Sequence, residues 1–232
     1  MRSSASTDSQ SLSIAVGASH RVSAVSIVPR TARACYVFAH GAGAGMTHPF
    51  MRSVAESLAE ADIATLRFQF PYMERGSGRP DPPALCHATV RAAVAEASRV
   101  SAGLPLIAGG RSFGGRMSSQ AQASSPLPGV IGLAFLGFPL HPAGKPSDER
   151  AQHLFETQLP LLFLQGDRDE LATLSLLKPL VERLGSRATL QLIPSADHSY
   201  KVPARTGRKP AQVTAELTLV LHDWIQSLIA SS

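Results

Sequence analysis

The residues most able to do chemistry are Gly110-Arg-Ser-Phe-Gly114, in which a serine stands between two glycines at the G-x-S-x-G spacing. In such a pentapeptide the serine lies on a sharp strand-to-helix turn that exposes its hydroxyl, and the glycines avoid collisions with the neighbouring strand and helix. An apolar run, Leu104–Ala108, ends just before it and a helix-like stretch follows. Ser112 is therefore the predicted nucleophile; the competing interpretation is a serine that caps the following helix.

An acyl-transfer site also needs a base that takes the serine proton and an acid that orients the base. His198 is the predicted base, because a neutral imidazole near physiological pH can accept that proton. Three carboxylates lie close together upstream as candidate acids, and we favour Asp169 over Asp167 and Glu170. Asp197 is adjacent to the base, so its side chain points elsewhere and we interpret it as a turn residue. The order Ser, Asp, His is that of α/β-hydrolases.

The tetrahedral intermediate of acyl transfer needs two backbone N–H donors. Phe113, the residue after the nucleophile, is the first. The glycine-rich loop His40-Gly-Ala-Gly-Ala-Gly45 supplies the second, with Ala42 as first choice and Gly43 next. Four residues of these loops and the later connection are predicted to contact substrate: His40, Gly43, Arg111 and His141.

Two arginines, Arg111 and Arg116, flank the elbow. Either one could bind a substrate carboxylate or form an ion pair within a helix or loop, and both interpretations stay open.

Other uses of the glycine-rich loop fit less well. A dinucleotide fingerprint starting at Gly41 would need a glycine at position 46, which is Met46. His40 and His48 show no metal-ligand spacing. We therefore predict neither a cofactor nor a metal.

Apolar runs alternate with segments of helical spacing along most of the chain. The predicted strands are 11–16, 21–28, 34–39, 63–70, 104–108, 130–138, 161–165 and 189–193, and the predicted helices are 47–61, 84–100, 115–123, 173–184 and 211–229. The first two strands are expected to form an antiparallel pair, and residues 71–83 a loop. Strands that alternate with helices indicate a mostly parallel sheet of about eight strands with helices on both faces. Together with the order Ser, Asp, His, this arrangement is typical of the α/β-hydrolase fold. Its active-site loops gather at the carboxyl ends of the strands.

Composition bounds the organisation and the partners. With 232 residues, 44% of them hydrophobic, we expect a disordered tail over residues 1–10 and a single domain over 11–232. The net charge of +5 is spread along the chain, which is poor support for a nucleic-acid partner. One local basic run is expected to be a solvated loop or to attract anionic substrates: Lys201, Arg205, Arg208 and Lys209.

Cysteine usage and hydropathy bear on the compartment. Cys35 and Cys86 form no disulfide framework, which favours a reducing cytoplasm. No apolar stretch reaches the about 20 residues that span a bilayer, so no membrane partner is expected. The expected partner is a small-molecule ester or thioester, and the protein is expected to be a monomer or a homodimer.

The motifs together resemble small serine α/β-hydrolases of the dienelactone-hydrolase-like group, in the branch that shares its domain with the third subunit of the NSL chromatin complex. The resemblance runs from about Cys35 to Ile229. It rests on six segments: 40–46, 66–73, 109–117, 137–146, 166–169 and 197–198. In such hydrolases the acid is the last residue of a G-x-x-D loop, which here is Asp169. Enzymes that act on dienelactone resemble a version with a cysteine nucleophile, so Ser112 does not imply that substrate.

The resemblance implies hydrolysis of a carboxylic ester or thioester. Its chromatin branch raises a second possibility, a hydrolase fold used as a binding module. Residues 139–160, where this fold inserts caps, are too few for a lid domain, so we expect an open site without interfacial activation. Three basic residues are expected either to border its mouth or to be solvated: His141, Lys145 and Arg150.

Overall fold

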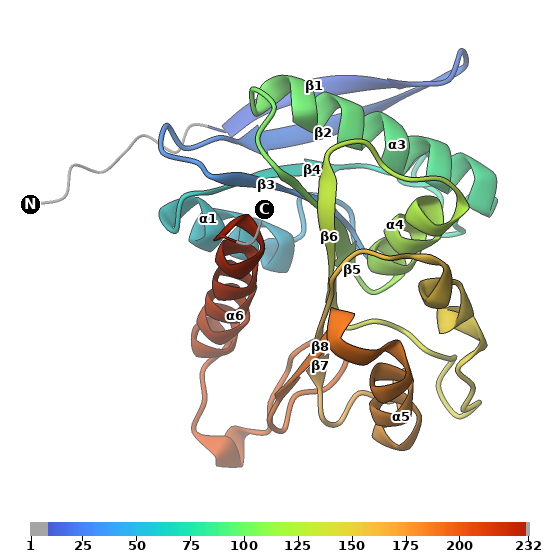
Figure 1. Cartoon of the computed structure of the whole chain (residues 1–232), viewed down its shortest axis with the longest axis vertical. Coiled ribbons are helices and arrows are strands. Elements are labelled where there is room, and N and C mark those ends of the chain that lie inside the picture. Colours follow the sequence, from blue (N-terminus) through green and yellow to red (C-terminus); the bar gives the residue numbers. More distant parts are fainter. Residues whose placement is uncertain (1–8, 231–232) are drawn as a thin grey trace, which may run out of the picture.

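A computed structural model describes residues 9–230, in which one eight-stranded sheet has the order β1-β2-β4-β3-β5-β6-β7-β8 (Figure 1). The strands are β1 (Ser9–Val16), β2 (His20–Ile27), β3 (Ala34–Ala39), β4 (Ile63–Phe68), β5 (Leu106–Arg111), β6 (Val130–Leu136), β7 (Leu161–Gly166) and β8 (Ala188–Ile193). The β1–β2 and β2–β4 pairs are antiparallel, and the other pairs are parallel. The predicted fold class is confirmed.

Helices cover both faces of this sheet (Figure 1). One face carries α1 (Pro49–Glu60) and α6 (Pro210–Ala230), and the other carries α3 (Pro83–Val100), α4 (Phe113–Ser124) and α5 (Leu174–Leu184). Side chains alternate between the two faces along each strand, so a strand contributes to the core on both sides of the sheet. In β3, Tyr36 and Phe38 pack on the α1 and α6 side, and Cys35 and Val37 pack on the opposite side. This is why the inner strands read as continuous apolar runs.

Shorter elements complete the chain: α2 (Pro71–Glu74) and the 3₁₀ helices η1 (Glu149–Glu156), η2 (Gly185–Arg187) and η3 (Ala204–Thr206). The helix α2 corrects the expectation of a loop over 71–83. Pro71 stands at the start of this turn, where its fixed φ favours a helix and its missing N–H has no cost.

The expected tail over residues 1–10 is also too long, because β1 begins at Ser9. Ser9 and Gln10 pair with Ile27 and Ser26 of β2. Their polar side chains are exposed at the sheet edge, so hydropathy does not reveal a strand that backbone pairing forms. The rest of the predicted tail, residues 1–8, lies outside the described residues.

Two features bear on access and on surface charge. Residues 139–160, between β6 and β7, contain η1 as their one helical element.

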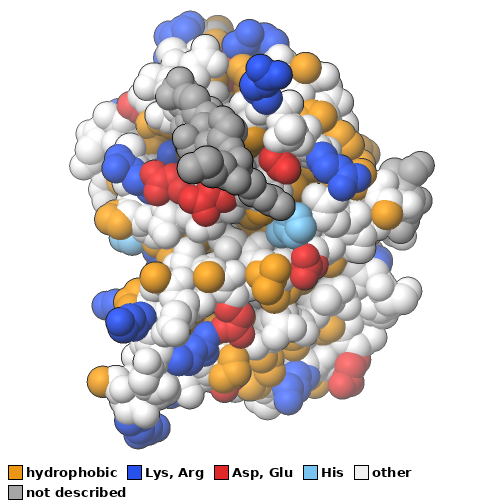
Figure 2. All heavy atoms as spheres, turned by 90° about the vertical axis from the view of Figure 1, so that its left-hand side faces the viewer, with side chains coloured by type: hydrophobic (Ala, Val, Ile, Leu, Met, Phe, Trp, Pro, Cys, Tyr) orange, Lys and Arg blue, Asp and Glu red, His pale blue; other side chains and the backbone are white. Residues whose placement is uncertain are grey.

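In the face that α1 and α6 form, acidic and basic side chains are interspersed (Figure 2). Within residues 9–230, no helix is both long enough and apolar enough to cross a membrane.

Candidate active site

The turn between β5 and α4 has the geometry of a nucleophile elbow. Ser112 has φ 48° and ψ −115°, a conformation that side chains rarely adopt. A Cβ at Gly110 would overlap the carbonyl oxygen of Ala39, and one at Gly114 would lie 2.5 Å from it. Both glycines are therefore needed because β3 passes directly beside the turn.

The loops after β5, β7 and β8 bring the predicted serine, acid and histidine together. Nε2 of His198 lies 2.8 Å from Oγ of Ser112, and its Nδ1 lies 2.7 Å from Oδ2 of Asp169. An Nδ1–H that donates to the carboxylate leaves Nε2 free to accept the serine proton. The side chain of Asp169 is fully buried, and that of His198 is 22% exposed.

The carboxylate of Asp169 is held from three directions. Besides His198, it accepts hydrogen bonds from the backbone N–H of Leu171 at 2.8 Å and from Nε2 of Gln165 at 2.5 Å. The oxygen Oε1 of the same Gln165 amide accepts a hydrogen bond from the backbone N–H of Phe138 at 2.9 Å. Gln165, buried at the end of β7, thus ties the acid to the loop after β6. Sequence reasoning did not single it out.

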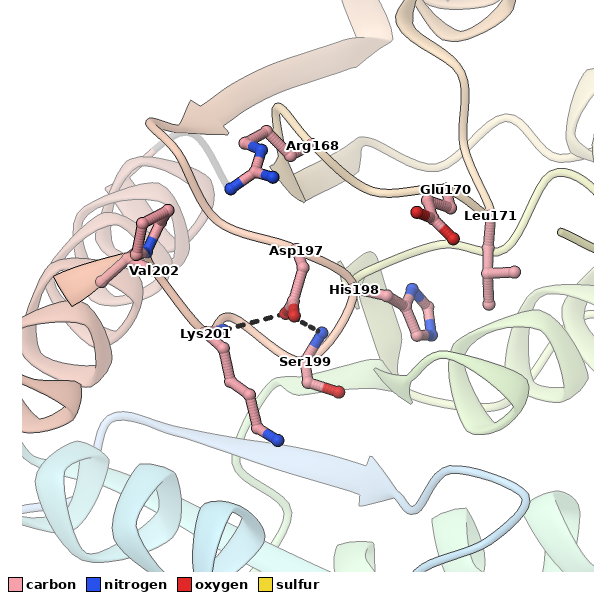
Figure 3. A pocket seen from close by; sticks show the side chains of 9 residues that line it. Arg168, Glu170, Leu171, Asp197, His198, Ser199, Lys201 and Val202 are labelled. Atoms are coloured by element: carbon pink, nitrogen blue, oxygen red, sulfur yellow. Dashed lines mark hydrogen bonds between the residues drawn. The ribbon is translucent and has the colours of Figure 1, made fainter. Parts of the chain in front are cut away.

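The neighbouring carboxylates lie elsewhere. Asp167 and Glu170 are exposed, whereas Asp169 turns inward from the same loop. Asp197 accepts hydrogen bonds from the backbone N–H groups of Ser199 and Lys201 through Oδ1 (Figure 3). The prediction that it is a turn residue is confirmed.

The two predicted oxyanion donors border the nucleophile. Ala42, Phe113 and Ser112 line one pocket of about 380 Å³. Among the described residues, neither the amide of Ala42 nor that of Phe113 donates a hydrogen bond to another protein atom. Both donors are therefore free to receive an oxyanion.

His40 supports this loop from behind. It is fully buried; Nδ1 lies 2.8 Å from the carbonyl oxygen of Gly41, and Nε2 accepts a hydrogen bond from the N–H of Phe70 at 3.1 Å. Because C=O and N–H of one peptide point in opposite directions, the N–H of Ala42 points away from the imidazole. The expectation that His40 contacts substrate is wrong, since burial and two hydrogen bonds occupy its ring.

Tyr72 of α2 fixes the next peptide of the same loop. Its hydroxyl donates to the carbonyl oxygen of Ala42 at 2.9 Å. The ring packs against His40 and Phe113, with centroid distances of 6.0 and 6.2 Å. Tyr72 therefore joins the two candidate oxyanion residues, a role that no sequence motif indicated.

We expect Tyr72→Phe to lower the kcat for ester hydrolysis about 3- to 10-fold, because the lost hydrogen bond loosens the peptide that follows the Ala42 amide. The control is Tyr36→Phe, which removes a comparable buried hydrogen bond, 3.0 Å to the carbonyl oxygen of Ala134. Steady-state kinetics of both variants checks this. Equal kcat values for them would contradict the role of Tyr72.

Three other predicted substrate contacts are placed differently. His141 is buried, with Nδ1 2.9 Å from the carbonyl oxygen of Pro142 and Nε2 accepting a hydrogen bond from the N–H of Thr173 at 3.1 Å. Its expected substrate contact is therefore also wrong: this histidine joins two loops. Gly43 is exposed, and the guanidinium of Arg111 lies over the ring of Phe50, 5.0 Å from its centroid. Neither of these two lines the pocket beside Ser112.

Burial lowers the pKa of His40 and of His153 from 6.5 to about 4. Unfolded chains take up these protons near the ordinary pKa, and the folded protein takes them up only near pH 4. Stability should therefore fall as the pH drops from about 6.5 towards 4, by about 1 to 3 kcal/mol for each histidine. Urea unfolding at pH 7 and pH 4.5 measures the loss. The loss should be smaller in His153→Gln, and an equal loss in both proteins would rule out His153 as a source.

Metal-ligating side chains are dispersed. Over residues 9–230, no three His, Cys, Asp or Glu side chains are grouped so that they could hold an ion.

Comparison with known proteins bears on the fold and the family. A family model described as an alpha/beta hydrolase domain matches residues 32–226. A dienelactone hydrolase from Anabaena variabilis aligns with a TM-score of 0.76 and 23% identity over 95% of this chain and 97% of that one. An alpha-beta serine hydrolase homologue from Coxiella burnetii aligns with a TM-score of 0.71 and 20% identity over 92% of this chain and 96% of that one. A serine hydrolase without lid from Xanthomonas campestris aligns with a TM-score of 0.70 and 21% identity over 97% of this chain and 95% of that one.

The sheet, the elbow and the loop constellation define a protein of the α/β-hydrolase class. Since the family model spans most of its length, the chain belongs to the alpha/beta hydrolase domain family. Membership supports hydrolase activity.

Proposed function

We propose that this protein is a serine hydrolase that cleaves a carboxylic ester or thioester of a small acyl substrate. The observation that carries the proposal is the continuous hydrogen-bonded array Ser112–His198–Asp169, with distances of 2.8 and 2.7 Å. A buried carboxylate, a partly exposed imidazole and a hydroxyl on a strained turn are the three parts that nucleophilic acyl transfer requires.

In the first half-reaction, Oγ of Ser112 attacks the carbonyl carbon while Nε2 of His198 takes the hydroxyl proton. Asp169 stabilises the imidazolium. The N–H groups of Ala42 and Phe113 hold the oxyanion of the tetrahedral intermediate. The intermediate collapses as His198 returns the proton to the leaving alcohol or thiol, and the acyl group stays on the serine.

In the second half-reaction, water attacks the acyl-enzyme. His198 takes a proton from the water, the same two N–H groups hold the second oxyanion, and the serine leaves with the proton that His198 returns. The products are a carboxylic acid and free enzyme.

Access to the site favours small substrates. The pocket beside Ser112 has about 380 Å³, and residues 139–160 contain η1 as their one helical element. We expect no jump in activity at the micelle concentration of an ester substrate, because no lid has to open.

Pre-steady-state hydrolysis of p-nitrophenyl acetate tests the proposal. We expect a burst of about one p-nitrophenol per protein molecule, absent in Ser112→Ala, because the acyl-enzyme forms before it is hydrolysed. Folded protein that gives neither a burst nor turnover, with this ester or with an acyl thioester, would overturn the proposal. It would favour the alternative of an α/β-hydrolase fold used as a binding module.

A further inference from the structure

Two pockets flank the candidate catalytic residues, and the chemistry assigns a different part of the substrate to each. One, of about 550 Å³, is bordered by His198 together with the loops after β7 and β8 (Figure 3). The other, of about 380 Å³, is bordered by Ser112, Ala42 and Phe113. Since His198 must protonate the leaving group, the leaving group belongs on the His198 side. The acyl chain then extends into the smaller pocket.

Two arginines line this acyl pocket, Arg116 from α4 and Arg150 from η1. Arg116 lies one helical turn after the nucleophile, with its guanidinium over the ring of Phe113, 5.8 Å from the centroid. Its Nε is buried and has no hydrogen-bond partner. Throughout residues 9–230, no side chain or carbonyl group forms a hydrogen bond or salt bridge with either guanidinium. Two positive charges thus share one small pocket.

Nearby charged groups do not neutralise the pair. Asp81 also lines the pocket; its Oδ1 is ion-paired with Arg75, which offsets its charge, and its buried Oδ2 has no hydrogen-bond partner among the described residues. Asp148, close to Arg150 in sequence, pairs with Arg183. Burial is the larger cause that lowers the pKa of Arg116. The positive charge of Arg150 lowers this pKa further, as expected for like charges held close together. The pocket therefore keeps a positive potential that an anionic ligand would relieve.

We propose that Arg116 and Arg150 bind a carboxylate at the far end of the acyl group, so that the substrates are monoesters or monothioesters of dicarboxylic acids. The proposal rests on the proposed function for the cleavage step. Planar guanidinium groups are suited to it because they pair with carboxylates through two parallel hydrogen bonds. The proposal also gives the two arginines beside the elbow different roles. Arg111 packs on Phe50 outside this pocket, whereas Arg116 lines the pocket.

Matched esters test the preference. The anionic series is the mono-p-nitrophenyl esters of adipic, pimelic and suberic acids. Each has a neutral partner with a methyl group in place of the carboxylate: p-nitrophenyl hexanoate, heptanoate and octanoate. For at least one chain length we expect kcat/KM to be about 10- to 100-fold higher for the anionic ester, as for charge-assisted hydrogen bonds. Arg150→Gln and Arg116→Gln should each remove most of this ratio.

Lys145→Gln is the control. It removes one positive charge from the same connection, at an exposed residue that does not line the acyl pocket. Its ratio should equal that of the parent protein. If all six esters are hydrolysed without an anionic preference, or if Lys145→Gln lowers the ratio as much as Arg150→Gln, the carboxylate site is overturned and the proposed function stands.

A binding measurement separates the two proposals when no ester is turned over. Calorimetric titration of Ser112→Ala with pimelate and with heptanoate needs no catalysis. We expect at least 10-fold tighter binding of pimelate, lost when Arg150→Gln is added. Equal or absent binding of both acids would overturn the carboxylate site.

Discussion

Ser112→Ala is expected to lower the kcat for p-nitrophenyl acetate by a factor on the order of 10⁴ to 10⁶, because the remaining residues can polarise the ester but cannot form an acyl-enzyme. Steady-state hydrolysis at saturating ester measures this. Retention of more than about one tenth of the parent rate would mean that another group attacks the ester.

Ser112→Gly is the informative companion variant. It should be equally inactive, yet its free energy of unfolding should exceed that of Ser112→Ala by about 1 kcal/mol. Glycine adopts φ 48° and ψ −115° readily, so the variant loses the backbone strain of this turn. The relief of strain outweighs the larger conformational entropy of its unfolded chain. Urea unfolding of the two variants decides the point. If Ser112→Gly were the less stable one, the turn would store no strain.

The second large effect is expected from Asp169→Asn, which should lower the kcat by about 10⁴-fold. The amide can still accept a hydrogen bond from the N–H of Leu171, so the loop should keep its shape. It cannot stabilise the imidazolium, and it favours the wrong tautomer of His198.

Asp167→Asn is the matched control, since this residue is exposed in the same loop. Its kcat should stay within about twofold of the parent value. If instead Asp167→Asn lost activity and Asp169→Asn kept it, the acid would be misassigned. Circular dichroism of both variants would show whether the fold is intact.

The fold and the turn that carries the candidate nucleophile were predictable because local patterns encode them. A strand that is buried on both faces is mostly apolar, and a turn pressed against β3 must have glycine at positions 110 and 114. The choice of Asp169 depended on which way one loop turns, and the G-x-x-D pattern indicated the inward residue.

Long-range hydrogen bonds were not predictable in the same way. His40 and His141 lie in loops near the site, but their rings are occupied by backbone groups distant in the sequence, Phe70 and Thr173. The contacts of Gln165 with Phe138 and of Tyr72 with Ala42 likewise join separate loops. No spacing along the chain encodes such pairs, because the sheet order brings them together.

Covalent labelling with a fluorophosphonate probe, followed by intact and peptide mass measurement, tests the central claim most directly. A serine activated by His198 and Asp169 should carry a single adduct on Ser112, absent after heat denaturation and in Ser112→Ala. Folded protein that remains unlabelled, or that is labelled at another serine, would contradict the assignment of Ser112 as an activated nucleophile.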